Sequence, residues 1–432
     1  MVITALIFVC IFLIIGVPIS FAFGLSGVLG VLISGKGVVP GYVLAQKMIG
    51  DLNTFTLLAI PLFMLAGNLM LKADISRRLL EFLRATTSWL RGGMGIACTA
   101  ACAIFGGMTG SGFASLNSIG QMSVQGFKDQ GYEKGFYTAM IAGGASLAPI
   151  IPPAPGMIVY ALVTGMSAGR LFIGGLGPGV VIAIVMSFVC MIYAKKKNID
   201  YTGHFDLKLF FKTFGGAVFA LVMPIIMMGG IMSGFFTATE AGVVACIYGI
   251  ICGMVIYRTM TFKDLVDACV STARACGMIL TVLMTAGILG YLFARSGSAQ
   301  SINLFLQSIP GMDNKYVLYT VMMAFFFIVG IPLEVMPIIR ILMPLIYPTV
   351  LASGIDPLVF GVSAVCFSVI GAISPPVGNY IFMSMKVTDC RYSDCSKYMW
   401  VMTAIFAGVI LLSGYLFPGI ITFIPNLTMG KG

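Results

Sequence analysis

The proline pair Pro152-Pro153 recurs in this chain as Pro375-Pro376, an offset of 223 residues. The surrounding sequence aligns at this offset without a gap, so that Gly107, for example, falls opposite Gly330. Each pair lies within an apolar stretch, and proline both lacks a backbone N–H and disrupts a helix. The duplication therefore predicts two similar folding units, each containing a helix that is broken in its middle.

The composition indicates that these units fold in lipid. Hydrophobic residues make up 59% of the chain and charged residues only 9%, whereas soluble proteins carry about 25% charged residues. Only helices and closed barrels satisfy their backbone polar groups inside a bilayer. The apolar runs are long and continuous rather than alternating, which favours helices over a barrel. We therefore expect an all-α polytopic membrane protein.

The positive charge has a distribution typical of membrane topology rather than of nucleic-acid binding. The formal net charge is +10, but most Lys and Arg residues lie in short loops between apolar runs. By the positive-inside rule such loops face the cytoplasm. The five basic loops are 72–91, 128–134, 195–212, 258–274 and 386–397. Because this distribution accounts for the positive charge, we expect no nucleic-acid partner.

This loop arrangement requires two re-entrant hairpins. If all five basic loops face the cytoplasm, residues 92–126 must enter and leave the membrane on that face, and residues 315–350 must do so on the other. The number of spans between the two copies is then odd, which predicts inverted repeats. The expected segments are 1–53 (N-terminal scaffold helices), 54–195 (repeat 1, hairpin about 92–126, broken helix about 135–165), 196–275 (inter-repeat scaffold helices and interfacial arms) and 276–424 (repeat 2, hairpin about 315–350, broken helix about 357–386).

The tip of the first hairpin has the composition of a cation site. Gly110 and Gly112 permit a sharp turn that exposes backbone groups, and Thr109 and Ser111 add hydroxyl oxygens. The break at Ala148–Pro153 leaves further carbonyls free. Such an oxygen cage suits a monovalent cation such as Na⁺, and the helix that starts after the tip directs its positive end toward an anion. The alternative is that the glycines only let helices pack closely.

The second hairpin adds a carboxylate to the same kind of arrangement. Glu334 falls opposite Ser111 at the 223-residue offset, and an acid within an apolar run is a candidate functional residue. Its alternative role is to cap backbone amides or to pair with Arg340. Near the second proline pair, Ser374 and Asn379 supply side-chain oxygens. We expect the substrate to contact Thr109, Ser111, Glu334 and Asn379.

Nothing in the sequence indicates catalysis or nucleotide hydrolysis. The chain contains no Gly-x-x-x-x-Gly-Lys-Ser/Thr phosphate loop. It also lacks paired carboxylates or a nucleophile motif that would support an enzyme. We therefore expect a transporter that uses no nucleotide.

These motifs together resemble the large membrane subunit of tripartite ATP-independent periplasmic (TRAP) transporters. The family's first hairpin more often reads Ser-Gly-Ser-Ser, whereas Thr109 and Gly112 stand at the outer positions here. Any cation contact at Gly112 must therefore come from the backbone. The matching stretches, which span nearly the whole chain, are Ala59–Gly67, Thr109–Gly112, Ile151–Pro153, Leu171–Gly179, Gly354–Gly361 and Ser374–Gly378.

The resemblance implies an elevator mechanism, in which a transport domain carries the substrate across a fixed scaffold, and it implies coupling to Na⁺. Two cation sites would follow, one in each repeat. The first would comprise Thr109, Gly110, Ser111, Gly112, Ala148, Ile151 and Pro153, and the second Gly330, Gly371, Ser374 and Val377.

The resemblance also implies partners and a location. A periplasmic substrate-binding protein would deliver an organic acid (a C4-dicarboxylate, sialic acid or a sugar acid), and a small four-helix membrane subunit would be a separate chain. The protein would be a multi-pass protein of the bacterial inner membrane. Two alternatives stay open at this point. One is a standalone Na⁺/dicarboxylate symporter that needs no binding protein, and the other is an intramembrane enzyme or a passive channel.

Overall fold

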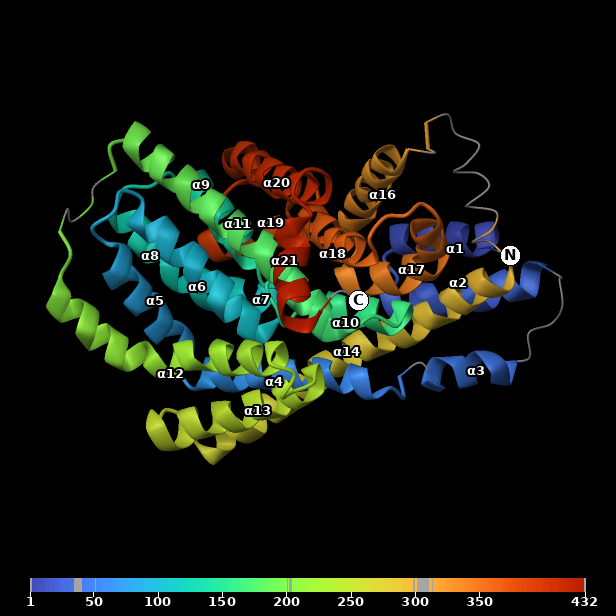
Figure 1. Cartoon of the computed structure of the whole chain (residues 1–432), viewed down its shortest axis with the longest axis horizontal. Coiled ribbons are helices and arrows are strands. Elements are labelled where there is room, and N and C mark those ends of the chain that lie inside the picture. The colour runs from blue at the N-terminus through green and yellow to red at the C-terminus, as the bar shows by residue number, and fades with distance from the viewer. Residues whose placement is uncertain are drawn as a thin grey trace.

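The computed structural model describes residues 2–34, 41–50, 52–199, 201, 204–297, 300, 311, 312 and 314–430. Every regular element within these residues is helical, so the prediction of an all-α chain is confirmed (Figure 1). The α-helices are α1 (Val2–Ile14), α2 (Ile19–Ser34), α3 (Gly41–Gly50), α4 (Ala59–Lys72), α5 (Ile75–Thr87), α6 (Gly93–Thr109), α7 (Gly112–Ser115), α8 (Gln121–Asp129), α9 (Lys134–Ser146), α10 (Pro155–Thr164), α11 (Ala168–Lys196), α12 (Leu207–Met232), α13 (Ala238–Ile250), α14 (Phe262–Arg295), α16 (Lys315–Gly330), α17 (Val335–Ala352), α18 (Pro357–Ile373), α19 (Asn379–Thr388), α20 (Tyr392–Tyr415) and α21 (Gly419–Met429).

The outer surface of the bundle is apolar, as a lipid environment requires. Seven of the described helices are long and apolar enough to cross a membrane. Large hydrophobic side chains such as Phe188, Ile225 and Phe235 are well exposed on α11, on α12 and just after α12. In water such a surface would drive aggregation; in a bilayer it is the favourable boundary.

Two helical hairpins are formed by α6 with α7 and α8, and by α16 with α17; that each enters and leaves the membrane on one face stays a prediction. In the first, α6 ends at Thr109, and Gly110 adopts a left-handed φ of 61° before α7 begins. The helix then continues without a gap through a π turn, Leu116–Gly120, into α8. In the second hairpin, four residues separate the end of α16 at Gly330 from the start of α17 at Val335.

The two broken helices have matching positions in the chain. The first breaks between α9 and α10, and the second between α18 and α19; both proline pairs are joined by cis peptide bonds. An offset of 223 residues moves the start of α9 to 357, where α18 begins, and the start of α10 to within one residue of the start of α19. The counterpart of α5, residues 298–310, lies almost wholly outside the described residues.

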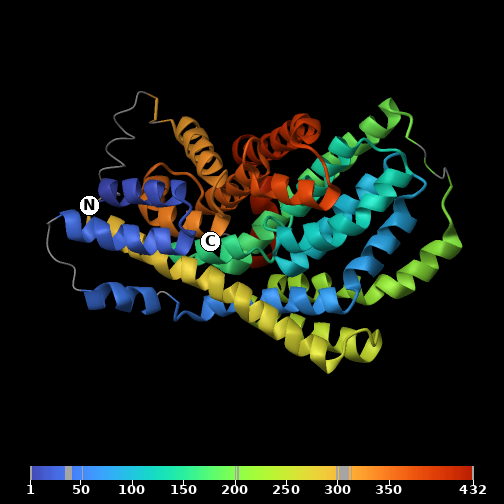
Figure 2. The same cartoon turned by 180° about the vertical axis from the view of Figure 1, so that it is seen from behind.

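The longest helix, α14, supports the rest of the bundle along one side. Figure 2 shows it crossing the molecule diagonally between α2 and the region of α4 and α13. Thr261 and Asp264 form a capping box at its start. Asp264 also pairs with Lys72 of α4 at 3.2 Å, and Thr272 accepts a 2.8 Å hydrogen bond from Asn68.

One expectation about this region differs from the structure. From the sequence we expect the inter-repeat segment, with its interfacial arms, to end at residue 275 and the second repeat to begin at 276. In the structure α14 runs without interruption from Phe262 to Arg295, across this boundary. The capping box explains the early start, since it fixes the first helical turn in polar surroundings, and no proline follows to interrupt the helix.

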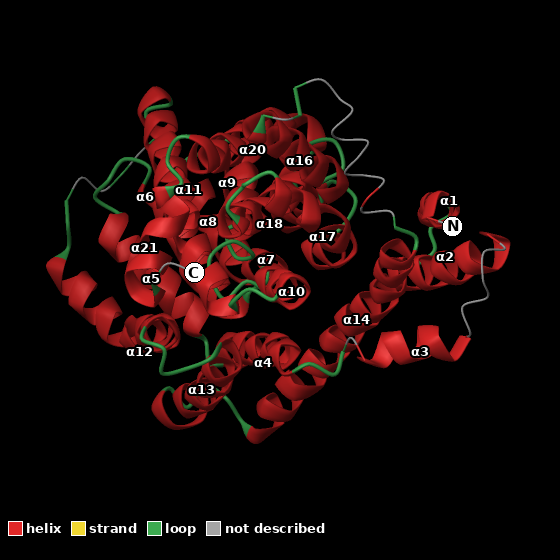
Figure 3. Ribbon diagram, turned by 45° about the vertical axis from the view of Figure 1, so that its right-hand side comes forward, coloured by secondary structure: helices red, strands yellow, loops and turns green. Residues whose placement is uncertain are grey.

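Figure 3 shows a compact group of helices that lies beside an outlying layer of other helices. The compact group contains both hairpins and both broken helices, with α11 and α20 packed against them. The helices α4, α12, α13 and α14 form the layer beneath, and α2 and α3 lie at the far end of α14. The segments with interrupted backbone therefore lie together on one side of the long helices.

Candidate functional site

Four helix N-termini meet where the hairpin tips reach the two breaks. A Cβ atom at Gly112, the start of α7, would overlap the ring of Tyr380 at the start of α19. A Cβ atom at Gly110 would lie 2.9 Å from Cδ of Pro155, the first residue of α10. A Cβ atom at Gly156 would lie 2.7 Å from Cγ1 of Val335, the first residue of α17. These contacts link all four helix starts.

This convergence brings together the positive ends of four helix dipoles, with the carboxylate of Glu334 at the start of α17. The first N–H groups of a helix have no partner within the helix, and its dipole places about half a positive charge at that end. Helix N-termini therefore bind carboxylates and other anions. Four of them around one point favour an anionic ligand there, which agrees with the expectation of an organic acid.

The contacts between the two halves are reciprocal to within one residue, since the 223-residue offset takes Gly112 to Val335 and Gly156 to Asn379, which directly precedes Tyr380. Gly112 in the first hairpin contacts Tyr380 in the second broken helix. Val335, which stands 223 residues after Gly112, contacts Gly156 in the first broken helix. Equivalent surfaces that contact each other in both directions are characteristic of an interface with two-fold symmetry.

The first proposed cation site brings together the end of α6 and the first break. Ala148 packs directly on Gly106, and a Cβ atom at Gly107 would lie 2.9 Å from the carbonyl oxygen of Pro152. The carbonyl oxygen of Pro153 would be 2.8 Å from a Cβ atom at Gly110. Within the described residues, no N–H donates to either proline carbonyl. These oxygens and the negative end of α6 suit a small cation.

The second proposed cation site brings together the end of α16 and the second break. Gly330 packs against the backbone of Ser368, and Gly371 packs against Gly330 so closely that only glycine fits. The Ser374 hydroxyl donates a 2.7 Å hydrogen bond to the carbonyl oxygen of Gly371. Val377 has an exposed side chain, so only its backbone can contribute to a site in the interior.

The donor atoms at both places are backbone carbonyls and hydroxyls, which are the ligands that hard cations prefer. No group of three or more His, Cys, Asp or Glu residues suited to a metal occurs among the described residues. The composition of both places therefore fits Na⁺, while the assignment of individual ligands stays a prediction.

The hydroxyls at the first tip hold the turn together. Thr109 Oγ1 lies 3.4 Å from the carbonyl oxygens of Gly106 and Ser111. Ser111 caps α7 by accepting a 3.3 Å hydrogen bond from the N–H of Ala114. The tip is therefore pre-shaped by its own side chains.

The two remaining candidate residues lie at the second tip and the second break. Glu334 is the N-cap residue of α17, its side chain is exposed, and it makes no hydrogen bond to the amides of the first turn. Its charge lies within electrostatic reach of the Tyr380 hydroxyl. Asn379, the first residue of α19, is partly exposed and directly precedes Tyr380.

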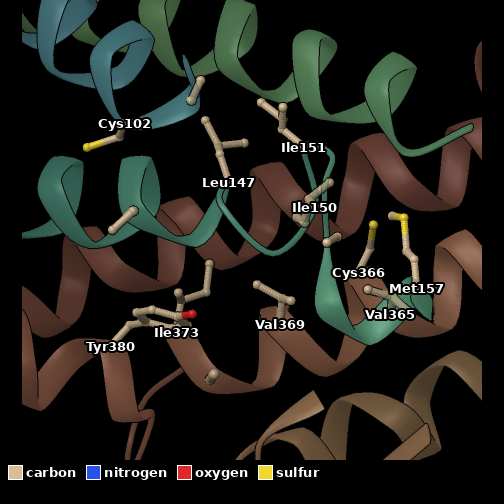
Figure 4. Close-up of a cluster of buried hydrophobic side chains, with 14 of the residues drawn as sticks. Cys102, Leu147, Ile150, Ile151, Met157, Val365, Cys366, Val369, Ile373 and Tyr380 are labelled. Atoms are coloured by element: carbon tan, nitrogen blue, oxygen red, sulfur yellow. The ribbon is translucent and has the colours of Figure 1, made fainter. Parts of the chain in front are cut away.

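Sequence reasoning missed Tyr380. Its ring is buried and stacks on Phe113 at a centroid distance of 5.0 Å, so it joins the first tip to the second break. Figure 4 shows the unwound segment from Leu147 to Ile151 lying beside α18, with Tyr380 near Ile373. The only signal in the sequence is its place directly after Asn379, because the 223-residue offset pairs it with a methionine.

Removing either candidate hydroxyl should weaken the response to Na⁺ more than it weakens assembly. We expect Ser374→Ala and Thr109→Ala to raise the Na⁺ concentration for half-maximal uptake severalfold, since a neutral hydrogen-bonding oxygen contributes about 0.5–1.5 kcal/mol. Ser413→Ala is the matched control, because Ser413 is equally buried and bonds to its own helix on α20. Unchanged Na⁺ titrations in both variants would show that neither hydroxyl belongs to a cation site.

Comparison with known proteins gives consistent matches over most of the chain. The family model described as "Tripartite ATP-independent periplasmic transporter, DctM component" matches residues 6–419. The sialic acid TRAP transporter large permease protein SiaM of Vibrio cholerae is 29% identical over 389 residues, which cover 90% of each chain. The C4-dicarboxylate TRAP transporter large permease protein DctM of Pseudomonas aeruginosa is 31% identical over 365 residues, which cover 84% of each chain.

The fold also matches a solved membrane protein. The YdaH transporter of Alcanivorax borkumensis superposes with a TM-score of 0.60 at 15% sequence identity, covering 88% of this chain and 89% of that one. At this identity the likeness concerns the fold alone. The curated relatives above are transporter permeases, so the prediction of a transporter rather than an enzyme is confirmed.

Proposed function

We propose that this chain, which belongs to the DctM family of tripartite ATP-independent periplasmic transporters, is the subunit that moves an organic acid across the membrane. A Na⁺ gradient would drive this transport. The match of residues 6–419 to the family model confirms the resemblance seen in the sequence. The chain is a multi-pass protein of the bacterial inner membrane. The observation that supports this function best is the meeting of four helix N-termini between two carbonyl-lined breaks.

The substrate class follows from the charge of this region and from the relatives. Four helix N-termini favour a carboxylate, and the described relatives are named for sialic acid and C4-dicarboxylates, which are both carboxylated. We propose a C4-dicarboxylate, sialic acid or a sugar acid as the substrate. Thr109, Ser111, Glu334 and Asn379 would contact it.

The tripartite name of the family supports the two proposed partners. A periplasmic binding protein would present the acid to the outer face of the chain. A small four-helix membrane subunit would pack against the scaffold helices as a separate chain.

The proposed mechanism is an elevator built from inverted repeats. The reciprocal contacts between the halves support a two-fold relation. The separation of the compact group from the layer of α4, α12, α13 and α14 supports a transport domain that slides on a scaffold (Figure 3). In this mechanism the tips of the two hairpins would alternately shield the substrate from either side.

Inverted repeats predict opposite accessibility for two loops. Gln130 follows α8, and Ala352 ends α17; these helices lie on opposite sides of the view in Figure 1. With the exposed Cys10 and Cys269 replaced by serine, we expect a cysteine at 130 to react with an impermeant maleimide only from the cytoplasm. A cysteine at 352 should react only from the periplasm. Labelling of both positions from one side would contradict the inverted arrangement.

Uptake by proteoliposomes tests the function as a whole. Radiolabelled sialic acid and succinate would be offered to the purified chain, with its small subunit, under an inward Na⁺ gradient. We expect accumulation only when both the gradient and the cognate binding protein are present. Accumulation without the binding protein would favour the standalone symporter, and accumulation without Na⁺ would contradict coupling.

A further inference from the structure

A lipid-facing groove runs between α6 and α11, away from the meeting point of the helix N-termini. Its cavity of about 400 Å³ is lined by Ala100 and Ala103 of α6, Ala183, Phe188 and Met191 of α11, and Ile151 of the first break. The small alanine side chains create the hollow. Ser187 is the one hydroxyl in its lining, and it donates to the carbonyl oxygen of Ala183 at 2.8 Å. We call this hollow the α6–α11 groove.

The volume of the groove distinguishes between two apolar occupants, a single alkyl chain and a protein helix. A ten-residue stretch of helix is about 10 Å across and 15 Å long and so fills on the order of 1,000 Å³. The groove is well under half that volume. A helix could therefore not sink into the groove, whereas a single alkyl chain can lie along its alanines, and the one hydroxyl in its lining already has a partner.

Three cations that form no ion pair with another described residue lie at one end of the groove. The backbone at Gly92 approaches α11 so closely that a Cβ atom would lie 3.0 Å from the amide nitrogen of Met191. Arg91 therefore lies at the groove's end, one turn of α11 from the exposed Lys195 and Lys196. Within the described part of the chain, no carboxylate forms an ion pair with these three residues.

The neighbouring Lys197, in contrast to these three residues, forms an ion pair. Its Nζ lies 3.4 Å from Glu133 Oε1. Hydrogen bonds from the Tyr398 and Tyr193 hydroxyls, and then Lys197, lower the pKa of the Glu133 carboxyl to about 2, so Glu133 carries its negative charge at neutral pH. Glu133 is thus already engaged by Lys197, which leaves the positive charge of Arg91, Lys195 and Lys196 for a ligand.

Aromatic residues at the same end mark the edge of the bilayer. Trp89 is exposed, and its indole N–H donates to the carbonyl oxygen of Thr86 at 2.8 Å. Arg91 lies over the ring of Tyr201 at 5.3 Å from its centroid. Tryptophan and tyrosine are enriched at the level of the lipid headgroups, which places the three cations at that level too.

We propose that the α6–α11 groove binds an anionic phospholipid, with one acyl chain against its alanines and the headgroup phosphate between Arg91, Lys195 and Lys196. The acyl chain would then contact Ile151, whose side chain also packs against Gly107 and Gly179. The lipid would thus touch the segment that carries the first proposed cation site. Binding is measured without transport, so its outcome is independent of the proposed function.

Native mass spectrometry of the full chain in mild detergent tests this site. Phosphatidylglycerol and phosphatidylethanolamine with identical acyl chains would be added in equal amounts. We expect the wild-type chain to retain phosphatidylglycerol about fivefold more than phosphatidylethanolamine, since each nearby cation favours an anionic lipid. Ala183→Phe, which fills the groove, should lose both lipids. The control Ile192→Phe, on the exposed face of α11 outside the groove, should keep them.

The charge variants give a second readout that does not depend on core packing. The triple variant Arg91→Gln, Lys195→Gln, Lys196→Gln should retain both lipids equally, while Lys128→Gln, an exposed cation on α8, should keep the preference. Equal retention by wild type and Ala183→Phe would overturn the proposal. So would a preference that survives the triple variant, or displacement of the lipid by the small membrane subunit.

Discussion

Gly112→Ala should abolish most Na⁺-driven uptake while the chain still folds. The added Cβ atom would overlap the ring of Tyr380. That ring cannot move aside easily, because it is buried and stacked on Phe113. Overpacking of this kind costs about 1–3 kcal/mol, and about 1.4 kcal/mol is a tenfold change in an equilibrium. We therefore expect uptake to fall about tenfold or more.

The control for this variant is Gly408→Ala. Gly408 lies on α20, and a Cβ atom there would meet no other atom within 4 Å. Melting temperature and co-purification with the small subunit, measured for both variants, separate a defect in transport from a defect in folding. If Gly112→Ala transported as well as Gly408→Ala, the contact between the first tip and the second broken helix would have no part in the transport cycle.

The interrupted elements could be predicted from the sequence because their causes are local. Pro152-Pro153 and Pro375-Pro376 break helices wherever they occur, and Gly110 is needed for its left-handed φ of 61°. The basic loops then required the segments between them to enter and leave on one face. The proline and glycine signals act within a few residues, and the loop argument counts charges along the chain, so none of them needed knowledge of packing.

The contacts that join the two halves could not be predicted in the same way. Tyr380 is important because it lies against Gly112, more than 250 residues away in the chain. Its own segment shows only an aromatic residue within an apolar run. Likewise, the capping box of Thr261 and Asp264 and the pairing of Asp264 with Lys72 became apparent only in the fold.

The candidate cation ligands also differ in how far the sequence alone predicts them. Backbone donors such as the carbonyls of Pro152 and Pro153 follow from the broken helix, and the structure brings them against the end of α6. The family resemblance implies Val377 at a cation site, and its exposed side chain leaves only its backbone to contribute there. The chain's direction at a break depends on what packs around it, and the sequence does not encode this locally.

Glu334→Gln should reduce uptake about tenfold or more. Glu334 is the carboxylate of the second hairpin tip, and its exposed side chain makes no capping hydrogen bond. Glutamine preserves the size of the residue and one acceptor oxygen but replaces the other oxygen with an NH₂ donor and removes the charge. A contact made by a charged group contributes about 1.5–3 kcal/mol, which corresponds to a tenfold effect or more. Uptake in proteoliposomes measures the loss.

Glu240→Gln is the matched control for this substitution. Glu240 forms the capping box of α13 with Thr237, far from either tip in the chain, and glutamine can fill the same capping position. It should therefore transport normally. Separate titrations then assign the role of Glu334: a shift in the acid concentration for half-maximal uptake indicates contact with the substrate, whereas a shift only in the Na⁺ titration indicates contact with a cation. Full activity of Glu334→Gln would leave the residue a purely structural role at the tip.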